Sequence, residues 1–272
     1  MKLAELFSFD NTTVFIYGQE KYFTDKNENK RIHISKDIDE CFQNSDIIIS
    51  GMPFSKDNVT VNSPYSNKKI TLEDIYINLE NKTFIAGGIP KWFYESKNIN
   101  NIDLLRCEEL AILNAIPTVE GTIKIAIEET ENTIHESNVL IFGYGRIGKI
   151  LCKRFDGLGA NVFCVARKDS DLAWIREARY IPIRYEELIN YAEKADLIVN
   201  TVPSLVIEEK FIKKLKQGCI IIDVASNPGG VDKEASKRYK IKVITALGIP
   251  GKVAPKTAAK YIKIIIEKKL KD

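Results

Sequence analysis

The chain has 272 residues, and its 40 lysines and arginines are nearly balanced by 37 aspartates and glutamates, which leaves a net charge of +3. This balance argues against a nucleic-acid-binding protein, and the length suits two domains, each with its own core. The five cysteines include no C-x-x-C pair, and together with only two histidines they are too scattered to predict a metal site.

The amino-terminal sequence predicts neither secretion nor membrane insertion. The segment from Met1 to Phe7 lacks the long apolar core of a signal peptide, and we identify no apolar run of about 18 residues that would span a bilayer. Free cysteines inside predicted elements suit a reducing compartment. We therefore expect a cytoplasmic protein without membrane contact.

The first part of the chain, residues 1–116, is predicted to form a small α/β domain. Short apolar runs that close on Gly or Pro turns predict parallel strands, and amphipathic segments predict helices. The Ser-, Asn- and Lys-rich stretch 56–69 predicts an exposed loop. The expected strands are 13–17, 47–50 and 83–86, and the expected helices are 3–7 and 36–45.

Residues 132–253 alternate regularly between apolar runs and helical segments. This rhythm is typical of a doubly wound parallel sheet, the Rossmann fold. Pro117 suits a first helical turn and predicts a linking helix over 117–131, and an amphipathic helix that crosses back is expected over 254–272. The expected strands of the Rossmann domain are 139–142, 161–166, 179–183, 196–200, 219–223 and 241–245. The predicted fold class is thus α/β, with a C-terminal Rossmann sheet and a smaller N-terminal α/β domain.

A glycine-rich turn follows the first strand of this domain. Glycines between a strand and a helix let the backbone approach a pyrophosphate, and the helix N-terminus supplies N–H donors and a favourable dipole. Glycines that serve only close helix–strand packing are the alternative. The turn consists of Gly143, Tyr144, Gly145, Arg146, Ile147 and Gly148.

Two cations at the end of the next strand indicate which dinucleotide the turn would bind. An acidic residue there would bond the ribose 2′-hydroxyl of NAD, whereas this chain has Arg167 and Lys168, which suit the 2′-phosphate of NADP. The alternative is an ordinary solvated strand end. The sequence predicts NADP as the cofactor.

The later strands end in segments rich in Gly and Pro, and in this fold ligands bind at the carboxyl ends of the strands. The first such segment, where a nicotinamide ribose would pass, adds Asn200, Thr201, Val202 and Pro203 to the predicted cofactor-binding residues. The segments 223–230 and 247–257 follow later strands. Such segments also occur as plain turns.

The two histidines are not expected to act in catalysis. His33 lies in a polar segment, and His135 precedes the first nucleotide-binding strand, at the end opposite the cofactor. This placement argues against a 2-hydroxyacid dehydrogenase, whose carbonyl chemistry needs a positioned acid.

Six segments taken together resemble the family of dipicolinate synthase A subunits, in order and from about Thr13 to the C-terminus. They are 114–122, 143–148, 166–168, 200–204, 223–230 and 250–257. The resemblance implies a spore-forming bacterium in which the mother-cell cytoplasm makes pyridine-2,6-dicarboxylate from a dihydrodipicolinate-type precursor. It also implies a flavoprotein-like partner, the B subunit of dipicolinate synthase; a homo-oligomer stays open.

Two departures from the family pattern stand out. Family members carry a strand and a Gly-containing turn ahead of the position of Met1, so the N-terminal sheet is expected to lack its first strand. Asn227 stands where a cation is expected in some relatives, which removes a reason to assign that position to the substrate.

A substrate with two carboxylates needs cations or N–H donors. Lys252 is the first candidate, both as a catalytic and as a substrate-binding residue, and Glu120 is the candidate base. A solvated lysine and helix-start capping groups are the alternative interpretations. The other predicted substrate-binding residues are Thr118, Gly229, Gly230, Lys256 and Thr257.

Three functions remain open. The first is an NADP-dependent dehydrogenase that makes dipicolinate together with its partner. The second is another NADP oxidoreductase of the hydroxyacid or shikimate type, and the third is a noncatalytic NADP-binding protein whose partner performs the chemistry.

Overall fold

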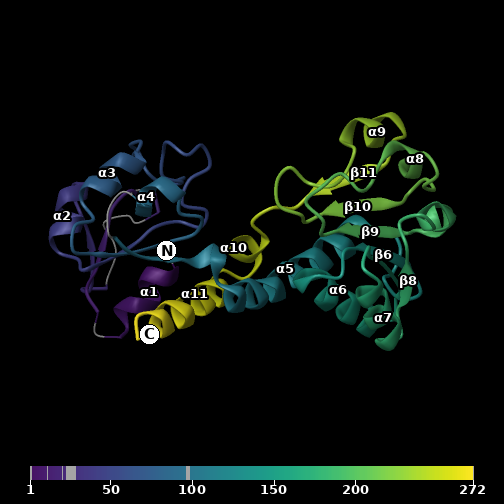
Figure 1. The fold of residues 1–272 in the computed structure, drawn as a ribbon, viewed down its shortest axis with the longest axis horizontal. Coiled ribbons are helices and arrows are strands. Elements are labelled where there is room, and N and C mark those ends of the chain that lie inside the picture. The colour runs from purple at the N-terminus through teal and green to yellow at the C-terminus, as the bar shows by residue number, and fades with distance from the viewer. Residues whose placement is uncertain (1, 11, 20, 23–28, 96–98, 272) are drawn as a thin grey trace. The chain divides into compact units, whose positions relative to one another are not determined.

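The computed structural model describes residues 2–10, 12–19, 21–22, 29–95 and 99–271 (Figure 1). The chain forms two compact units. Unit 1 comprises Met1–Leu113 and Pro255–Asp272, and unit 2 comprises Asn114–Ala254. Each unit is described by itself.

The described residues of unit 1 form five short strands in two parallel sheets. A two-stranded sheet pairs β1 with β2, and a three-stranded sheet has the order β3-β4-β5. The strands are β1 Val14–Ile16, β2 Ile32–Ile34, β3 Ile47–Ile49, β4 Thr83–Ala86 and β5 Asn100–Asp103. The helices are α1 Lys2–Ser8, α2 Ile38–Gln43, α3 Leu72–Ile77, α4 Lys91–Glu95, the 3-10 turn η1 Leu104–Arg106 and α11 Pro255–Lys269.

The core of unit 1 is aromatic. Phe54, Phe84 and Phe93 are each 0% exposed, and their ring centroids lie 5.0 to 5.4 Å apart. Rings at such distances gain contact energy beyond the burial of their area. The C-terminal helix α11 joins this unit because Ile265 and Ile266 pack into a second cluster with residues of β4 and η1.

Two strands of unit 1 are not predicted from the sequence, β2 and β5. β5 reads Asn-Asn-Ile-Asp and has no apolar run; it is a strand because it pairs with β4. The stretch 56–69 is largely exposed, as expected. It is nevertheless held by bridges from Ser55 to Val61 and from Thr60 to Thr71.

Unit 2 contains one parallel sheet of six strands in the order β11-β10-β9-β6-β7-β8. This confirms the predicted Rossmann fold. The strands are β6 Asn138–Phe142, β7 Asn161–Val165, β8 Ile181–Ile183, β9 Leu197–Asn200, β10 Ile220–Asp223 and β11 Lys242–Thr245. The helices are α6 Arg146–Gly157, α7 Asp169–Glu177, η2 Leu188–Lys194, α8 Glu209–Ile212, α9 Lys233–Arg238 and α10 Ile249–Val253.

Both faces of this sheet are covered, which explains the unbroken apolar runs of its strands. Successive residues of a strand point to opposite faces. Val139 and Ile141 therefore lie in the core under α6 and α7, while Leu140 and Phe142 lie in the core under η2, α8 and α9 (Figure 1). The direction of winding changes between β6 and β9, and the carboxyl ends of the strands meet at one edge.

The long helix α5, Glu108–Glu129, corrects two expectations. It begins nine residues before Pro117 (117 − 108 = 9), so the predicted linking helix 117–131 is wrong at its start, and Pro117 lies inside the helix. Proline lacks the N–H that would bond residue 113, but packing compensates because Pro117 and Val119 are buried.

By length and composition α5 could also cross a membrane, contrary to the expectation that no such segment exists. In the structure, however, its residues are part of the cores. Leu110 packs with the second cluster of unit 1, and Val119 and Ala126 pack with the sheet of unit 2. The core helix of a globular protein shows this same composition.

Candidate functional site

The glycine-rich turn connects β6 to α6, and two of its glycines are required by geometry. Gly143 has a φ of 93°, and a Cβ there would lie 2.6 Å from the Thr201 hydroxyl. A Cβ on Gly148 would lie 2.0 Å from the carbonyl oxygen of Gly143. The helix therefore begins directly against the end of the strand, which brings its first N–H groups to the carboxyl edge of the sheet.

The N-terminus of α6, like those of α7, α8 and α10, has no side-chain cap among the described residues. Asp37, Thr71 and Asp232 cap α2, α3 and α9 with their side chains, whereas the N-cap of α6 is Gly145. A Cβ on Gly145 would meet nothing within 4 Å. This twelve-residue helix thus presents its positive end to open space, the arrangement that holds a pyrophosphate.

The other residues of the turn point in different directions. Ile147 and Tyr144 are partly buried against the core under α6, and Lys149 lies over the Tyr144 ring at 5.5 Å from its centroid. Burial raises the pKa of the Tyr144 phenol to about 12, so it stays protonated at neutral pH. Arg146, the first residue of α6, is exposed at the turn.

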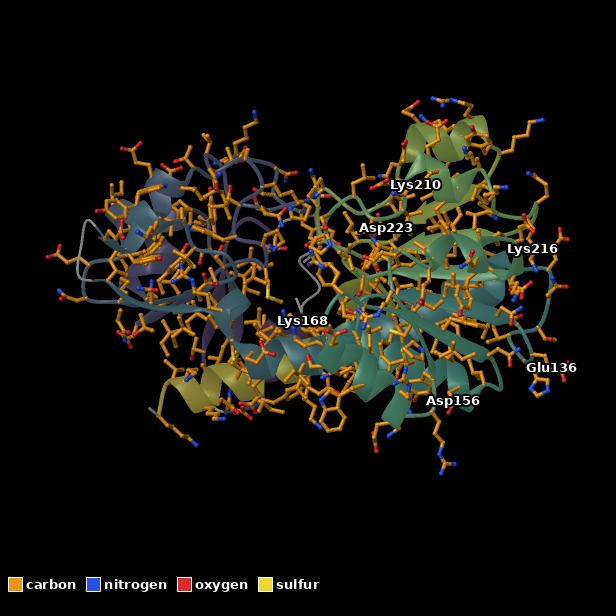
Figure 2. All side chains as sticks on the ribbon, turned by 45° about the vertical axis from the view of Figure 1, so that its right-hand side comes forward. Glu136, Asp156, Lys168, Lys210, Lys216 and Asp223 are labelled. Atoms are coloured by element: carbon orange, nitrogen blue, oxygen red, sulfur yellow. The ribbon has the colours of Figure 1, made fainter. Side chains whose placement is uncertain are left out.

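The predicted cations lie where β7 ends. Arg167 and Lys168 are exposed, and Lys168 is the N-cap of α7. Within the described ranges neither of them forms an ion pair. Figure 2 shows Lys168 and Asp223 on one side of unit 2, and Lys216 and Glu136 on the opposite side.

The segment after β9 uses its side chains to hold the edge of the sheet together. The Thr201 hydroxyl and its backbone N–H both donate to the carbonyl of Phe142, at 2.7 and 3.0 Å, so β9 is fastened to the end of β6 beside the turn. Asn200 is fully buried and does not face the surface. Its side chain orders the loops that follow β9 and β10. Val202 is partly buried and Pro203 is exposed.

A buried carboxylate that was not predicted from the sequence organises the next loop. Asp223, the last residue of β10, is 0% exposed and accepts hydrogen bonds from Asn200 Nδ2 at 2.9 Å, Gly230 N at 3.1 Å and Ala225 N at 3.2 Å. The one signal in the sequence is an acid that directly follows three isoleucines of a buried strand.

The backbone N–H groups of Gly229 and Gly230, predicted as substrate donors, are bonded within the protein. Gly229 N donates to the Ser226 carbonyl at 2.9 Å, and Gly230 N donates to Asp223. Both donors are already used inside the protein. A Cβ on Gly229 would lie 2.7 Å from Asp223 Oδ2, and one on Gly230 2.5 Å from Asn200 Nδ2, so these glycines let the loop pass over the buried pair.

The other predicted substrate residues lie on three helices. Thr118 is inside α5 and donates to the Asn114 carbonyl at 2.7 Å, so it is not a cap and its donor is used within the helix. Glu120 on α5 and Lys252 on α10 are exposed. Their helices touch, because a Cβ on Gly121 would lie 2.2 Å from Ile249 Cγ2. Lys256 and Thr257 are exposed in the first turn of α11, which belongs to unit 1.

The remaining candidates for a site can be set aside. His33 and His135 are both exposed, and His135 lies three residues before β6, at the amino end of the sheet. Among the described residues no group of His, Cys, Asp or Glu is arranged to hold a metal.

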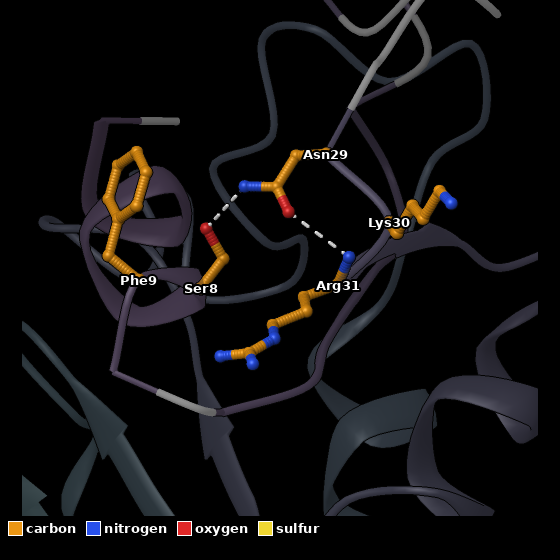
Figure 3. Close-up of a pocket in the computed structure, with 5 residues that line it drawn as sticks. All are labelled: Ser8, Phe9, Asn29, Lys30 and Arg31. Carbon is orange, nitrogen blue, oxygen red and sulfur yellow. Dashed lines mark hydrogen bonds between the residues drawn. The ribbon is translucent and has the colours of Figure 1, made fainter.

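A hollow in unit 1 is lined by Ser8, Phe9, Asn29, Lys30 and Arg31 (Figure 3). Asn29 Nδ2 donates to Ser8 Oγ at 2.8 Å there. It lies at the amino end of β2, whereas ligands of open parallel sheets bind at the carboxyl ends.

Two known families match separate parts of the chain. Residues 1–104 match the family described as the N-terminal domain of the dipicolinate synthase A subunit. Residues 118–235 match "D-isomer specific 2-hydroxyacid dehydrogenase, NAD binding domain". The second match covers the glycine turn, the Arg167–Lys168 pair and the Asn200–Asp223 pair.

Individual relatives extend the likeness over both units. The dipicolinate synthase A subunit of Bacillus subtilis (strain 168) is 34% identical over 239 residues, which is 86% of this chain and 80% of that protein. The crystal structure of the dipicolinate synthase A subunit from Bacillus halodurans matches with a TM-score of 0.87 at 28% identity, over 100% of this chain and 93% of that one. The crystal structure of the corresponding chain from Bacillus subtilis matches with a TM-score of 0.86 at 29% identity, over 99% and 91%.

Proposed function

The chain belongs to the family of dipicolinate synthase A subunits, and on that premise we propose that it oxidises dihydrodipicolinate, or its hydrated precursor, to pyridine-2,6-dicarboxylate with NADP. The dehydrogenase-type domain over residues 118–235 supports a dehydrogenase-like protein with a nicotinamide cofactor. The specific reaction and the choice of NADP are our proposal.

The residues of the turn fit a dinucleotide. A Cβ on Gly143 would collide with the Thr201 hydroxyl, and one on Gly148 with the Gly143 carbonyl, so glycines are needed for α6 to begin this close to the end of β6. The uncapped N-terminus of α6 faces the same edge. Gly143, Gly145 and Gly148 would let the pyrophosphate approach the backbone, with Arg146 at its side. The observation that carries the choice of NADP is the pair of exposed cations, Arg167 and Lys168, where NAD-dependent domains place an acid.

Several of this chain's residues would handle the substrate. A nicotinamide ring, when bound, accepts a hydride. Lys252 of unit 2 would hold a carboxylate, because an ammonium group donates to carboxylate oxygens. Lys256 and Thr257, on the part of the chain that belongs to unit 1, stay predicted substrate-binding residues. Glu120 would take the proton that leaves the substrate ring. Loss of one hydride and one proton from a dihydropyridine leaves an aromatic ring, so product stability drives the reaction; a hydrated precursor loses one water in addition.

A partner and a cellular setting complete the proposal. The relatives are named as one of several subunits of an enzyme, which supports a complex of more than one kind of chain. We infer a flavoprotein-like B subunit of dipicolinate synthase as the partner, and action in the mother-cell cytoplasm during sporulation.

A second candidate, a hydroxyacid dehydrogenase, is favoured by the family match over residues 118–235. The exposure of His33 and His135 argues against it, since reduction of a carbonyl needs an acid held in the site.

The experiment that tests the proposal is co-expression with the B subunit, followed by an assay of dihydrodipicolinate consumption with NADP and with NAD. We expect formation of the pyridine dicarboxylate, and we expect Glu120→Gln to lower kcat about 100-fold or more, as loss of a general base does. Glu128→Gln, on the same helix and exposed, is the matched control and should keep full activity.

Two outcomes would contradict the proposal. Turnover of hydroxyacids by the chain alone would favour the second candidate. Unchanged activity of the complex with both Glu120→Gln and Lys252→Ala would indicate that this chain binds nucleotide without taking part in catalysis.

A further inference from the structure

Arg184 stands beside the cations that end β7. Strands β7 and β8 are parallel neighbours with Val165 opposite Ile183, and Ala166 N donates to the Ile183 carbonyl at 3.2 Å. The residues that follow the two strands therefore emerge together at the carboxyl edge. This register places Arg184 next to the segment that carries Arg167 and Lys168.

The guanidinium of Arg184 is held by a carboxylate from α7. Nη2 of Arg184 forms an ion pair with Oδ1 of Asp169, the first residue of α7 and the neighbour of Lys168. The two side chains are 50% and 80% exposed. An ion pair this exposed is weak and easily exchanged for another anion.

Arg167 approaches the same place from the other strand. Val165 of β7 pairs with Ile183 of β8. Arg167 therefore leaves the sheet at the same edge as Arg184. Three cations, Arg167, Lys168 and Arg184, thus gather at the ends of β7 and β8, with Asp169 among them.

We propose that Arg184 is a third ligand of the nucleotide 2′-phosphate, and that Asp169 occupies its guanidinium until a 2′-phosphorylated nucleotide displaces it. This inference rests on the proposed use of NADP and deepens it. A phosphate dianion carries more charge than a carboxylate and accepts two parallel hydrogen bonds from a guanidinium. A nucleotide with a free 2′-hydroxyl cannot displace Asp169 and gains no bond from Arg184, so the pair favours NADP over NAD.

A purely structural role for the pair makes a different prediction. If Arg184 and Asp169 only fasten the end of β8 to α7, removal of either partner lowers stability and affects both nucleotides equally. If they select the nucleotide, the two variants act on NADPH alone, and in opposite directions.

The test is a titration of the full chain with NADPH and with NADH, using the wild type, Arg184→Gln, Asp169→Asn and Arg238→Gln. Arg238 is the matched control because its guanidinium also forms an exposed ion pair, with Glu209, at the other edge of the sheet. We expect Arg184→Gln to weaken NADPH binding about 10- to 100-fold, the range for a lost charge-assisted contact, without change for NADH. Asp169→Asn should tighten NADPH binding about threefold to tenfold, and Arg238→Gln should change neither.

The outcomes separate this inference from the proposed function. A wild type that prefers NADPH, with the preference unchanged in both variants, would overturn the role of Arg184 and leave the use of NADP intact. A wild type without preference would overturn both. Selective loss of NADH binding in Asp169→Asn would show that Asp169 serves the ribose hydroxyl, which also overturns the inference. If Arg184→Gln does not fold, Asp169→Asn tests the inference by itself. Unchanged NADPH affinity in Asp169→Asn would contradict the displacement of Asp169 from Arg184 by the 2′-phosphate.

Discussion

The side-chain amide of Asn200 donates a hydrogen bond to the carboxylate of Asp223 across 2.9 Å, and the two residues stand directly opposite each other on β9 and β10. Both side chains are 0% exposed. The pair joins two strand ends, and through Gly230 N and Val202 N it also fixes the loops that follow both strands. The floor of the candidate site is thus built from buried polar contacts.

Removal of the buried carboxylate should destabilise unit 2. Asp223→Ala leaves the N–H groups of Ala225 and Gly230 without their acceptor and removes one of the two acceptors of the Asn200 amide. Each unsatisfied donor costs about 1–3 kcal/mol. We expect a free energy of unfolding lower by roughly 3 kcal/mol or more in urea titration. Asp156→Asn, an exposed acid on α6, should stay within about 0.5 kcal/mol of wild type. A small effect at Asp223 would show that water replaces the carboxylate.

Helix α6 should tolerate alanine at Gly157 but not at Gly148. Gly148→Ala puts a Cβ 2.0 Å from the Gly143 carbonyl oxygen, so strand and helix must separate, and we expect loss of nucleotide binding in calorimetry. Gly157→Ala, at the other end of α6, meets nothing within 4 Å. It should bind nucleotide normally and gain up to about 1 kcal/mol of stability, as alanine does over glycine in helices. Equal binding by both variants would contradict a pyrophosphate site at the turn.

The preference for NADP should reverse when the first cation is replaced by an acid. Arg167→Asp removes a phosphate ligand and adds an acceptor for a ribose hydroxyl. We expect NADPH affinity to fall about 100-fold, with NADH affinity unchanged or higher. Lys153→Asp makes the same change of charge on an exposed residue of α6 and should leave the preference in place. A preference that survives Arg167→Asp would remove the argument for NADP.

Stability should fall at alkaline pH through the buried thiols. Burial raises the pKa of Cys219 from 9.0 to about 12, so in the folded state the thiol keeps its proton where the unfolded chain has lost it. The contribution of Cys219 is fully present below pH 9.0 and is lost as the pH rises toward about 12. We expect Cys219→Ala to show a shallower loss of stability than wild type as the pH rises above 9.0, measured by urea titration. The same slope in both proteins would mean that other groups account for the loss.

Much of unit 2 could be predicted because its signals are local. The central strands are largely apolar because helices cover both faces. The glycine turn is a continuous stretch, and its glycines indicate where the backbone must turn tightly. Pro117 led to a wrong helix start for the same reason. Taken locally it predicts the first turn of a helix, whereas burial in the folded chain keeps it inside α5.

By itself, the sequence determined the order of elements in unit 2, the glycine turn and the presence of cations after β7. Tertiary structure decided which side chains meet: Asn200 with Asp223, Arg184 with Asp169, and the N–H groups of Gly229 and Gly230 with acceptors inside the protein. Partners 15 or 23 residues apart come together only through strand register and through the order in which strands pair. The register and the pairing order depend on how the whole sheet packs, and no short stretch of the chain determines them.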